Sequence, residues 1–455
     1  MKVGLLPFYI TLYDDLSKKY RYRMERFYET IAKMLEAKCI EVVRNPFCME
    51  EPDFENAIQN FEDQVCDAVV TLHMAYSPSL KSAKALKSTK LPIIICDTTD
   101  TYDFSCQQSP DEIMYCHGIH GVMDMCNLLH KNGKLYALAT GHYLKSNVID
   151  QVVGYIKAAV AAKSLYGSKV GTIGGRFDGM GDFAVSDDKL FSRFGVKVVR
   201  PQKQEINKML ATISNDQIKK EIERYQQQYV FLETPDEETL TQSVKADLVI
   251  KKWVKSNALQ AFTVNFRDVE ELPTMPFHGI CEIMHEKIGY AGEGDILTAA
   301  FSGALLQQYP KTSFVELFCP DWEHSSVLIS HMGEMNYDLA NEKPELFVKP
   351  FTYCKASNPV TGSAGFKPGK GVFLNIFEDY AEFKAFITNV EVLPETTNNF
   401  KGNIRGWLKF ERPIEDVLKK ISDCGATHHS ILIYDSTEEE IVFFAKNLGL
   451  KTIGL

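Results

Sequence analysis

The strongest constraint on the fold is the alternation of short apolar runs with longer amphipathic segments through residues 1–165. The apolar runs predict strands at residues 2–7, 39–43, 68–73, 91–96 and 135–140. Because helical patterns fill the intervals, we expect right-handed crossovers that join the strands into a parallel sheet. Ligand loops of such a sheet lie at the carboxyl ends of its strands. Residues 117–131 lie between two of these strands.

The alternation restarts after residue 166 and changes character after residue 312. The middle part predicts strands at 169–173 and 261–265 and helices at 215–227, 236–257, 278–286 and 295–308. The last part predicts short strands at 313–316, 327–330, 371–376 and 404–410, separated by Pro, Gly and Asn turns, and a helix, strand and helix over 413–448. We therefore predict α/β domains at 1–166 and 167–312 and a mostly β domain at 313–455.

Charge and cysteine content exclude several classes of protein. Fifty basic and sixty acidic side chains give a net charge of −10, the wrong sign for a surface that neutralises nucleic-acid phosphates. The early apolar run at residues 3–13 contains Pro7, is too short to span a bilayer and lacks signal-peptide features, so we expect a cytoplasmic protein without a membrane partner. Eleven cysteines without a C-x-x-C pair are expected to be small buried side chains.

A glycine-rich stretch runs from Gly171 to Gly181 after a predicted strand, as a dinucleotide-binding turn would. It lacks the G-x-G-x-x-G spacing, and no helical pattern opens directly after Gly181. A site that binds phosphate at a helix N-terminus is therefore not expected here. We interpret the stretch as a plain loop.

Glu293 stands between Gly292 and Gly294, which leave backbone room for a ligand or metal beside its carboxylate. Asp295 is in position to cap the helix that follows, which would fix this loop against a rigid element. A surface turn is the alternative explanation of the same four residues.

Three predicted strands carry further side chains that can bind a metal. Glu316 interrupts one apolar strand, His331 ends a second, and His428 and His429 precede a third. A buried carboxylate is costly unless it is paired or binds a metal, although a single histidine at a strand end is usually structural. Two carboxylates and two imidazoles form a ligand set suited to Mn²⁺, Co²⁺ or Mg²⁺.

With these motifs in order, the sequence resembles the L-arabinose isomerase family, within the wider group that includes L-fucose isomerase. The best agreement covers residues 261–266, 272–273, 289–295, 298–300, 312–316 and 330–332, and weaker agreement covers 72–73, 77–78, 120–121, 184–187 and 427–429. The resemblance implies two flavodoxin- or Rossmann-like α/β domains followed by a mostly β domain. It also implies an aldose-ketose isomerase that acts on a small unphosphorylated sugar through a cis-enediol intermediate.

The resemblance assigns roles to individual residues. It implies Glu293, Glu316, His331 and His429 as ligands of a divalent metal, with Glu293 and Glu316 also acting as the acid/base pair. It implies sugar contacts at His120 and Phe266, with His117 and His428 as further candidates; His428 has a structural role beside a ligand as its alternative. It also implies a homo-oligomer, a hexamer or trimer, in which the segment around His120 serves a neighbouring subunit's site.

Departures from the family pattern cluster at the expected sugar pocket, at Ile10, His117 and Leu317. When a polar side chain that hydrogen-bonds a sugar hydroxyl is lost, the selectivity of the site between sugars changes strongly. We therefore predict an altered sugar preference, with L-arabinose, a related pentose, a deoxy-sugar or D-galactose as candidates. Three alternatives stay open: a sugar-binding module without chemistry, a metal-dependent epimerase or aldolase, and a metal-assisted hydride shift in place of the enediol.

Overall fold

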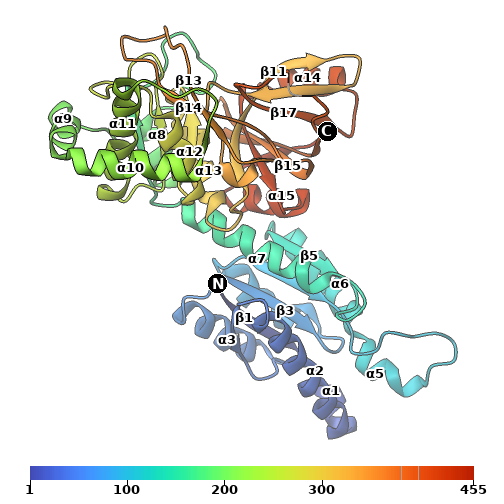
Figure 1. Cartoon of the computed structure of the whole chain (residues 1–455). Helices are drawn as coiled ribbons and strands as arrows, with labels where there is room; N and C mark the ends of the chain where they lie inside the picture. Colours follow the sequence, from blue (N-terminus) through green and yellow to red (C-terminus); the bar gives the residue numbers. More distant parts are fainter. Residues whose placement is uncertain (381, 398) are drawn as a thin grey trace. The chain divides into compact units, whose positions relative to one another are not determined.

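A computed structural model describes residues 1–380, 382–397 and 399–455 of the chain (Figure 1). The chain divides into two compact units, Met1–Val160 and Ala161–Leu455. No helix among the described residues is long and apolar enough to cross a membrane.

The first unit is built on a parallel five-stranded sheet with strand order β2-β1-β3-β4-β5. The strands are β1 Lys2–Phe8, β2 Glu41–Arg44, β3 Ala68–His73, β4 Ile93–Asp97 and β5 Tyr136–Thr140. The helices are α1 Thr11–Leu16, α2 Lys18–Glu36, α3 Glu51–Asp63, α4 Ala83–Ser88, α5 Ile113–Cys116 and α6 Gly118–Lys131, with α7 Val148–Leu165 continuing into the second unit.

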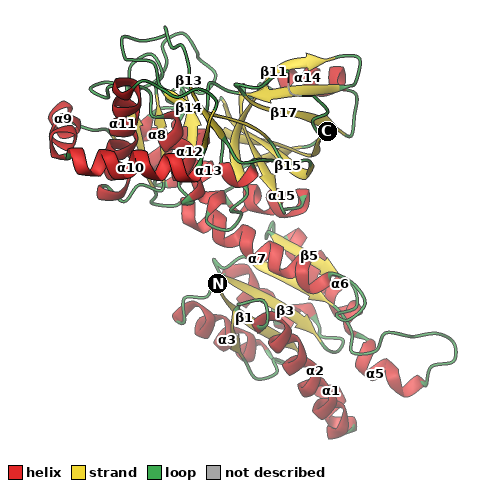
Figure 2. Cartoon of the chain, viewed as in Figure 1, coloured by secondary structure: helices red, strands yellow, loops and turns green. Residues whose placement is uncertain are grey.

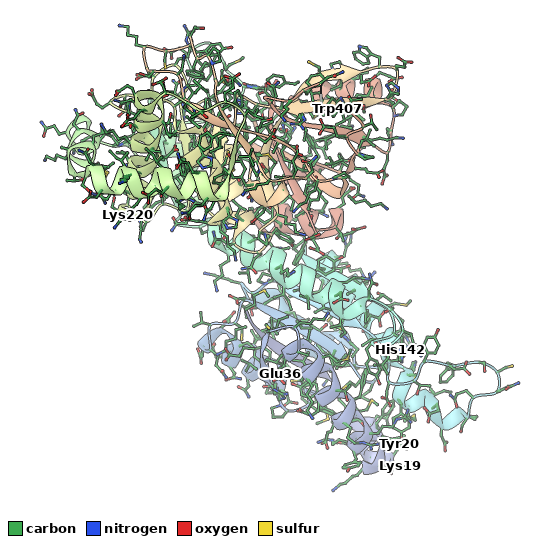
Figure 3. The ribbon with its side chains drawn as sticks, viewed as in Figure 1. Lys19, Tyr20, Glu36, His142, Lys220 and Trp407 are labelled. Carbon is green, nitrogen blue, oxygen red and sulfur yellow. The ribbon has the colours of Figure 1, made fainter. Side chains whose placement is uncertain are left out.

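The inner strands of this sheet are buried and mostly apolar because helices cover both of its faces (Figure 2). Every residue of β3 and β4 is buried. A Cβ atom at Gly4 would lie 2.2 Å from the ring of Phe61 on α3, so β1 and α3 pack closely there. Glu36, the last residue of α2, pairs with Arg44 at the end of β2 (Figure 3).

The second unit contains a four-stranded parallel sheet with strand order β10-β9-β6-β7. Its strands are β6 Lys169–Ile173, β7 Lys197–Val199, β9 Ala261–Val264 and β10 Gly289–Gly292. Its helices are α8 Asp187–Phe194, α9 Lys203–Thr212, α10 Asn215–Gln228, α11 Glu237–Ser256, α12 Phe277–His285 and α13 Ile296–Leu306. Every residue of α13 is buried, which explains why that helix is apolar on all sides.

A larger, mixed sheet completes the second unit in the order β19-β16-β15-β18-β11-β12-β17-β14-β13-β8. An additional pairing of β16 with β17 closes the strands between them into a barrel-like ring. The strands are β8 Val230–Phe231, β11 Thr312–Asp321, β12 Ser326–Ser330, β13 Glu345–Val348, β14 Val360–Gly365, β15 Gly369–Asp379, β16 Glu382–Val392, β17 Ile404–Phe410, β18 His429–Tyr434 and β19 Lys451–Ile453; the helices are α14 Ile414–Asp423 and α15 Glu438–Asn447.

The predicted fold class is confirmed: parallel α/β sheets precede a mostly β barrel-like part. Strand β11 extends to Asp321, beyond the predicted end at residue 316, because it continues as a partly exposed hairpin with β12. Short strands such as β7 and β10 were not predicted. The three domain boundaries stay a prediction.

The expectation that the cysteines are buried is correct for only part of them. None of the eleven forms a disulfide, but only Cys48, Cys66, Cys96 and Cys281 are buried. The others are at least partly exposed because several lie in loops or at helix surfaces rather than in apolar strands.

Candidate functional site

Side chains from four separate segments of the second unit meet at one place. Glu316 lies on β11, His331 follows β12 directly, His429 begins β18, and Glu293 follows β10. The antiparallel register pairs Glu316 with His429 on one side and with Ser330, the residue before His331, on the other. Sheet pairing therefore brings together ligand candidates that are more than a hundred residues apart in sequence.

The distances between these side chains are compatible with a shared ligand. His331 Nε2 lies 3.7 Å from Glu316 Oε2, and His429 Nε2 lies 3.8 Å from Glu293 Oε2. His428 Nε2 lies 3.5 Å from the same oxygen of Glu293. Two groups, Glu316-His331-His429 and Glu293-His428-His429, each place all their ligand atoms within 4.8 Å of one another.

The loop that carries Glu293 has a backbone that few residues adopt. Glu293 has a φ of 62°, in the left-handed region, and Gly294 has a φ of 82°. The amide of Gly294 donates to Thr263 Oγ1 at 2.9 Å, and the carbonyl of Glu293 accepts from the amide of Phe177 at 2.9 Å. These bonds hold the Glu293 carboxylate in place.

Gly292 is required by close packing rather than by its backbone angles. A Cβ atom there would lie 2.8 Å from Cε1 and 3.1 Å from Nε2 of His331. Any larger residue at this position would push the imidazole away from Glu316.

A carboxylate orients each imidazole of the cluster. His331 Nδ1 lies 2.6 Å from Glu334 Oε2, and His429 Nδ1 lies 3.0 Å from Asp295 Oδ2. Because an ionised carboxylate only accepts hydrogen bonds, each Nδ1 donates, and each Nε2 is left facing the cluster.

The carboxylates also change the protonation of the site. Burial lowers the pKa of His331, but the charges of Glu334 and Glu316 outweigh it and raise that pKa. Burial raises the pKa of Glu316, although the neighbouring His331 and His429 oppose this. The neighbouring carboxylates thus favour a positively charged His331, and a bound cation would take the place of that proton.

Three atoms of the cluster are buried without a hydrogen-bond partner among the described residues: Glu293 Oε2, His428 Nε2 and His429 Nε2. Buried polar atoms are normally paired, so such a group of three needs an explanation. Carboxylate oxygen and imidazole nitrogen are donors that suit Mn²⁺, Co²⁺ and Mg²⁺ to different degrees. The residues present therefore fit a divalent metal.

Aromatic rings enclose the cluster. Phe183 stacks on His429 with ring centroids 4.9 Å apart, and the edge of Phe314 contacts both His331 and His429 at 5.0 Å. The apolar rings limit the water that reaches the two imidazoles, which strengthens their electrostatic interactions.

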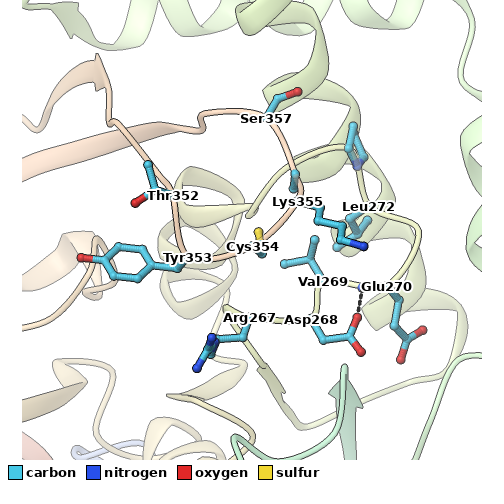
Figure 4. Close-up of a pocket in the computed structure, with 12 residues that line it drawn as sticks. Arg267, Asp268, Val269, Glu270, Leu272, Thr352, Tyr353, Cys354, Lys355 and Ser357 are labelled. Atoms are coloured by element: carbon cyan, nitrogen blue, oxygen red, sulfur yellow. Dashed lines mark hydrogen bonds between the residues drawn. The ribbon is translucent and has the colours of Figure 1, made fainter.

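Phe266, the predicted pocket aromatic, is buried between Phe177 and Tyr353, whose ring centroids lie 5.2 and 5.7 Å away. Tyr353 and Arg267 also line a cavity of about 700 Å³ (Figure 4). That volume is in the range of small-molecule sites. The ligand candidates themselves do not line this cavity.

His117 and His120 lie in the first unit, at the start of α6. His120 Nδ1 lies 3.2 Å from His117 Nε2, and Tyr13 Oη lies 3.3 Å from His117 Nδ1. Tyr76 packs on His120 with ring centroids 4.6 Å apart. The two predicted sugar-contacting histidines therefore form one polar cluster with two tyrosines, in which His120 is exposed and Tyr13 is buried.

Sequence reasoning missed Glu334 and Asp182, which bond to His331 and His428 respectively. For Glu334 a signal was present, since it follows His331 by three residues. For Asp182 the only signal was its position directly after Gly181, in a stretch that was interpreted as a plain loop. The predicted helix cap by Asp295 is confirmed by its bond from the amide of Thr298 at 2.9 Å.

Comparison with known proteins gives one consistent family. Sequence profiles of the L-arabinose isomerase central domain and C-terminal domain match residues 175–307 and 311–451. An L-arabinose isomerase of Oceanobacillus iheyensis is 24% identical over 87% of this chain and 85% of its own length. L-arabinose isomerase 2 of Bacillus licheniformis is 23% identical over 87% of this chain and 85% of its own length. The L-arabinose isomerase of Pediococcus pentosaceus is 24% identical over 87% of this chain and 86% of its own length.

Among solved structures, a periplasmic solute-binding protein of Actinobacillus succinogenes with bound D-allose covers 67% of this chain and 90% of its own. Its sequence identity is 13% and its TM-score 0.18, values too low to support a conclusion about this chain.

Proposed function

Because the chain belongs to the L-arabinose isomerase family and is an aldose-ketose isomerase, we propose that it interconverts L-arabinose and L-ribulose, or a related pentose or hexose pair, in a metal-dependent reaction. The observation that carries the proposal is that Glu316, His331 and His429 place their ligand atoms within 4.8 Å of one another, with Glu293 Oε2 lying 3.8 Å from His429 Nε2.

These four residues would hold the metal, for which Mn²⁺, Co²⁺ and Mg²⁺ are the candidates. The support is the donor set, its burial and the unpartnered atoms Glu293 Oε2 and His429 Nε2. When bound, the cation supplies Lewis-acid stabilisation of charge that develops on the sugar oxygens. Glu334 and Asp295 fix the imidazoles so that each presents Nε2.

Glu293 and Glu316 would act as the acid/base pair. One carboxylate takes the proton from C2 of the aldose while the C1 carbonyl oxygen gains a proton, which gives a cis-enediol. A proton then returns to C1 while the C2 hydroxyl proton is released to form the ketose carbonyl. Deuterium from the solvent should therefore appear at C1 during turnover in ²H₂O. A hydride shift predicts no such exchange.

The sugar is proposed to be small and unphosphorylated, with Phe266, His117, His120 and His428 as binding residues. Support for Phe266 comes from its place beside the 700 Å³ cavity. We also propose a homo-oligomer, a hexamer or trimer, by analogy with the family; light scattering of a fully active monomer would contradict it.

The experiment that tests the function is an assay of ketose formation from a panel of aldoses with Mn²⁺ present. We expect turnover of at least one pentose or hexose, and an altered preference because of Ile10, His117 and Leu317. A kcat/KM for L-arabinose above that of every other sugar would contradict the altered preference.

A further inference from the structure

The glycine-rich segment 174–183 contacts the candidate metal cluster at several points. The amide of Phe177 donates to the carbonyl of Glu293 at 2.9 Å, and a Cβ atom at Gly294 would lie 2.2 Å from the carbonyl oxygen of Gly175. Phe183 stacks on His429 with an interplanar angle of 12°. The segment is therefore part of the wall of the site.

Asp182 in this segment makes two bonds to one residue. Its Oδ2 accepts from the backbone amide of His428 at 2.9 Å and from His428 Nδ1 at 2.7 Å. These two bonds fix both the position and the ring orientation of His428. With Nδ1 held by Asp182, only Nε2 of that imidazole is available to a ligand.

Nε2 of His428 faces Glu293 Oε2 at 3.5 Å and has no hydrogen-bond partner among the described residues. The His428 side chain is 24% exposed, whereas His331 and His429 are 3% and 0% exposed. His428 is thus the most exposed of the three imidazoles, although its Nε2 atom is itself buried. The other two imidazoles contact Phe314.

A second cation at His428 is disfavoured by the geometry. The groups Glu293-His428-His429 and Glu316-His331-His429 share His429. Nδ1 of His429 bonds to Asp295, so its single remaining nitrogen can serve only one metal at a time. His428 is then left for a different ligand.

We propose that Asp182 is a positioning residue that aims Nε2 of His428 at a sugar hydroxyl beside Glu293. The proposal rests on the proposed isomerase function and deepens it by naming the contact that sets sugar affinity. Asp182, near the end of the glycine-rich segment, then belongs to the sugar site.

The test compares Asp182→Ala, His428→Asn and the double variant with wild type. We expect the KM for the preferred aldose to rise by about 10- to 100-fold in each single variant, while the Mn²⁺ dissociation constant measured by calorimetry stays within about twofold. Because Asp182 and His428 act through one contact, the KM of the double variant should be no higher than the higher KM of the two single variants. Asp182→Asn should keep most of the affinity, because its amide oxygen can accept both bonds.

Asp178→Ala is the matched control, since Asp178 is an exposed carboxylate in the same segment, and it should leave KM unchanged. The proposal is overturned if Asp182→Ala weakens Mn²⁺ binding as much as His429→Asn, because His428 would then be a metal ligand. It is also overturned if Asp182→Ala leaves KM unchanged.

Calorimetric titration of the Mn²⁺-loaded chain with the aldose distinguishes failure of this proposal from failure of the proposed isomerase function. If Asp182→Ala weakens sugar binding but wild type shows no turnover, the isomerase function is contradicted, whereas the contact between His428 and the sugar is supported. Wild type that binds no aldose would contradict both.

Discussion

Asp295 connects the start of helix α13 to a proposed metal ligand: its Oδ1 accepts from the amide of Thr298 at 2.9 Å and its Oδ2 lies 3.0 Å from His429 Nδ1. Asp295 and His429 have no exposed surface. One carboxylate thus fixes both the loop that carries Glu293 and the imidazole that faces it.

We predict that Asp295→Asn lowers Mn²⁺ affinity by about 10- to 100-fold while the helix cap survives. The amide oxygen can still accept from Thr298, but the amide NH₂ would oppose the donor at His429 Nδ1. Calorimetric titration with Mn²⁺ measures the change. Asp236→Asn, which alters the exposed cap of α11, should leave Mn²⁺ affinity as it is; equal affinities in both variants would contradict the role of Asp295.

Gly292→Ala should also weaken Mn²⁺ binding by tenfold or more, because a Cβ atom would lie 2.8 Å from Cε1 of His331 and force that ring to move. The same titration checks it. Gly454→Ala is the control, since a Cβ atom there meets nothing closer than 3.8 Å. A Gly292→Ala variant that binds Mn²⁺ like wild type would show that His331 is not held by this contact.

Glu316 and His331 could be singled out from the sequence because one interrupts and the other ends an apolar strand; that they and the other candidates bind a metal stays a prediction. The sequence could not predict Asp182 as the partner of His428, 246 residues away, because only the fold brings these two segments together; Glu334, three residues after His331, left a local signal that was overlooked. Strand β10, the four residues Gly289–Gly292, was missed because two glycines give it a weak strand pattern. The local cap of Asp295 was predictable, whereas its bond to His429, 134 residues away, was not.

A buried ion network on helices α10, α11 and α12 should make stability depend on pH. Glu282 accepts from Arg224 Nη2 at 2.6 Å and from Lys251 Nζ at 2.5 Å. Burial raises the pKa of Glu282, but His278, Arg224 and Lys251 outweigh it and hold that pKa far below its usual 4.5. This stabilisation is therefore complete above about pH 4.5 and is lost as the pH falls below that value.

Glu282→Gln should accordingly lower the free energy of unfolding by about 2 kcal/mol at pH 7, because Arg224 and Lys251, both partly buried, lose one carboxylate partner and keep only Glu221. The difference from wild type should shrink as the pH falls below 4.5. Urea unfolding at a series of pH values measures both effects. Glu286→Gln, at an exposed glutamate beyond the end of α12, should change stability by less than about 0.5 kcal/mol. A constant difference between Glu282→Gln and wild type across this range would contradict the charge-based explanation.

Glu293→Gln and Glu316→Gln should each lower kcat by about 100-fold or more, since general acid/base catalysis alone contributes at least that factor. Circular dichroism should show an unchanged fold. Glu323→Gln, in the exposed turn of the hairpin that carries Glu316, is the control and should keep full activity. More than a tenth of wild-type kcat in either variant would refute the acid/base role of that glutamate.

The central claim is that the cluster of Glu293, Glu316, His331 and His429 binds the divalent metal on which isomerisation depends. Its most direct test is ketose formation by the EDTA-treated chain before and after one equivalent of Mn²⁺, with the preferred aldose from the panel. The account predicts no ketose from the metal-free chain, restored turnover with Mn²⁺, and no restoration in His331→Asn. Full ketose formation by the metal-free chain would contradict it.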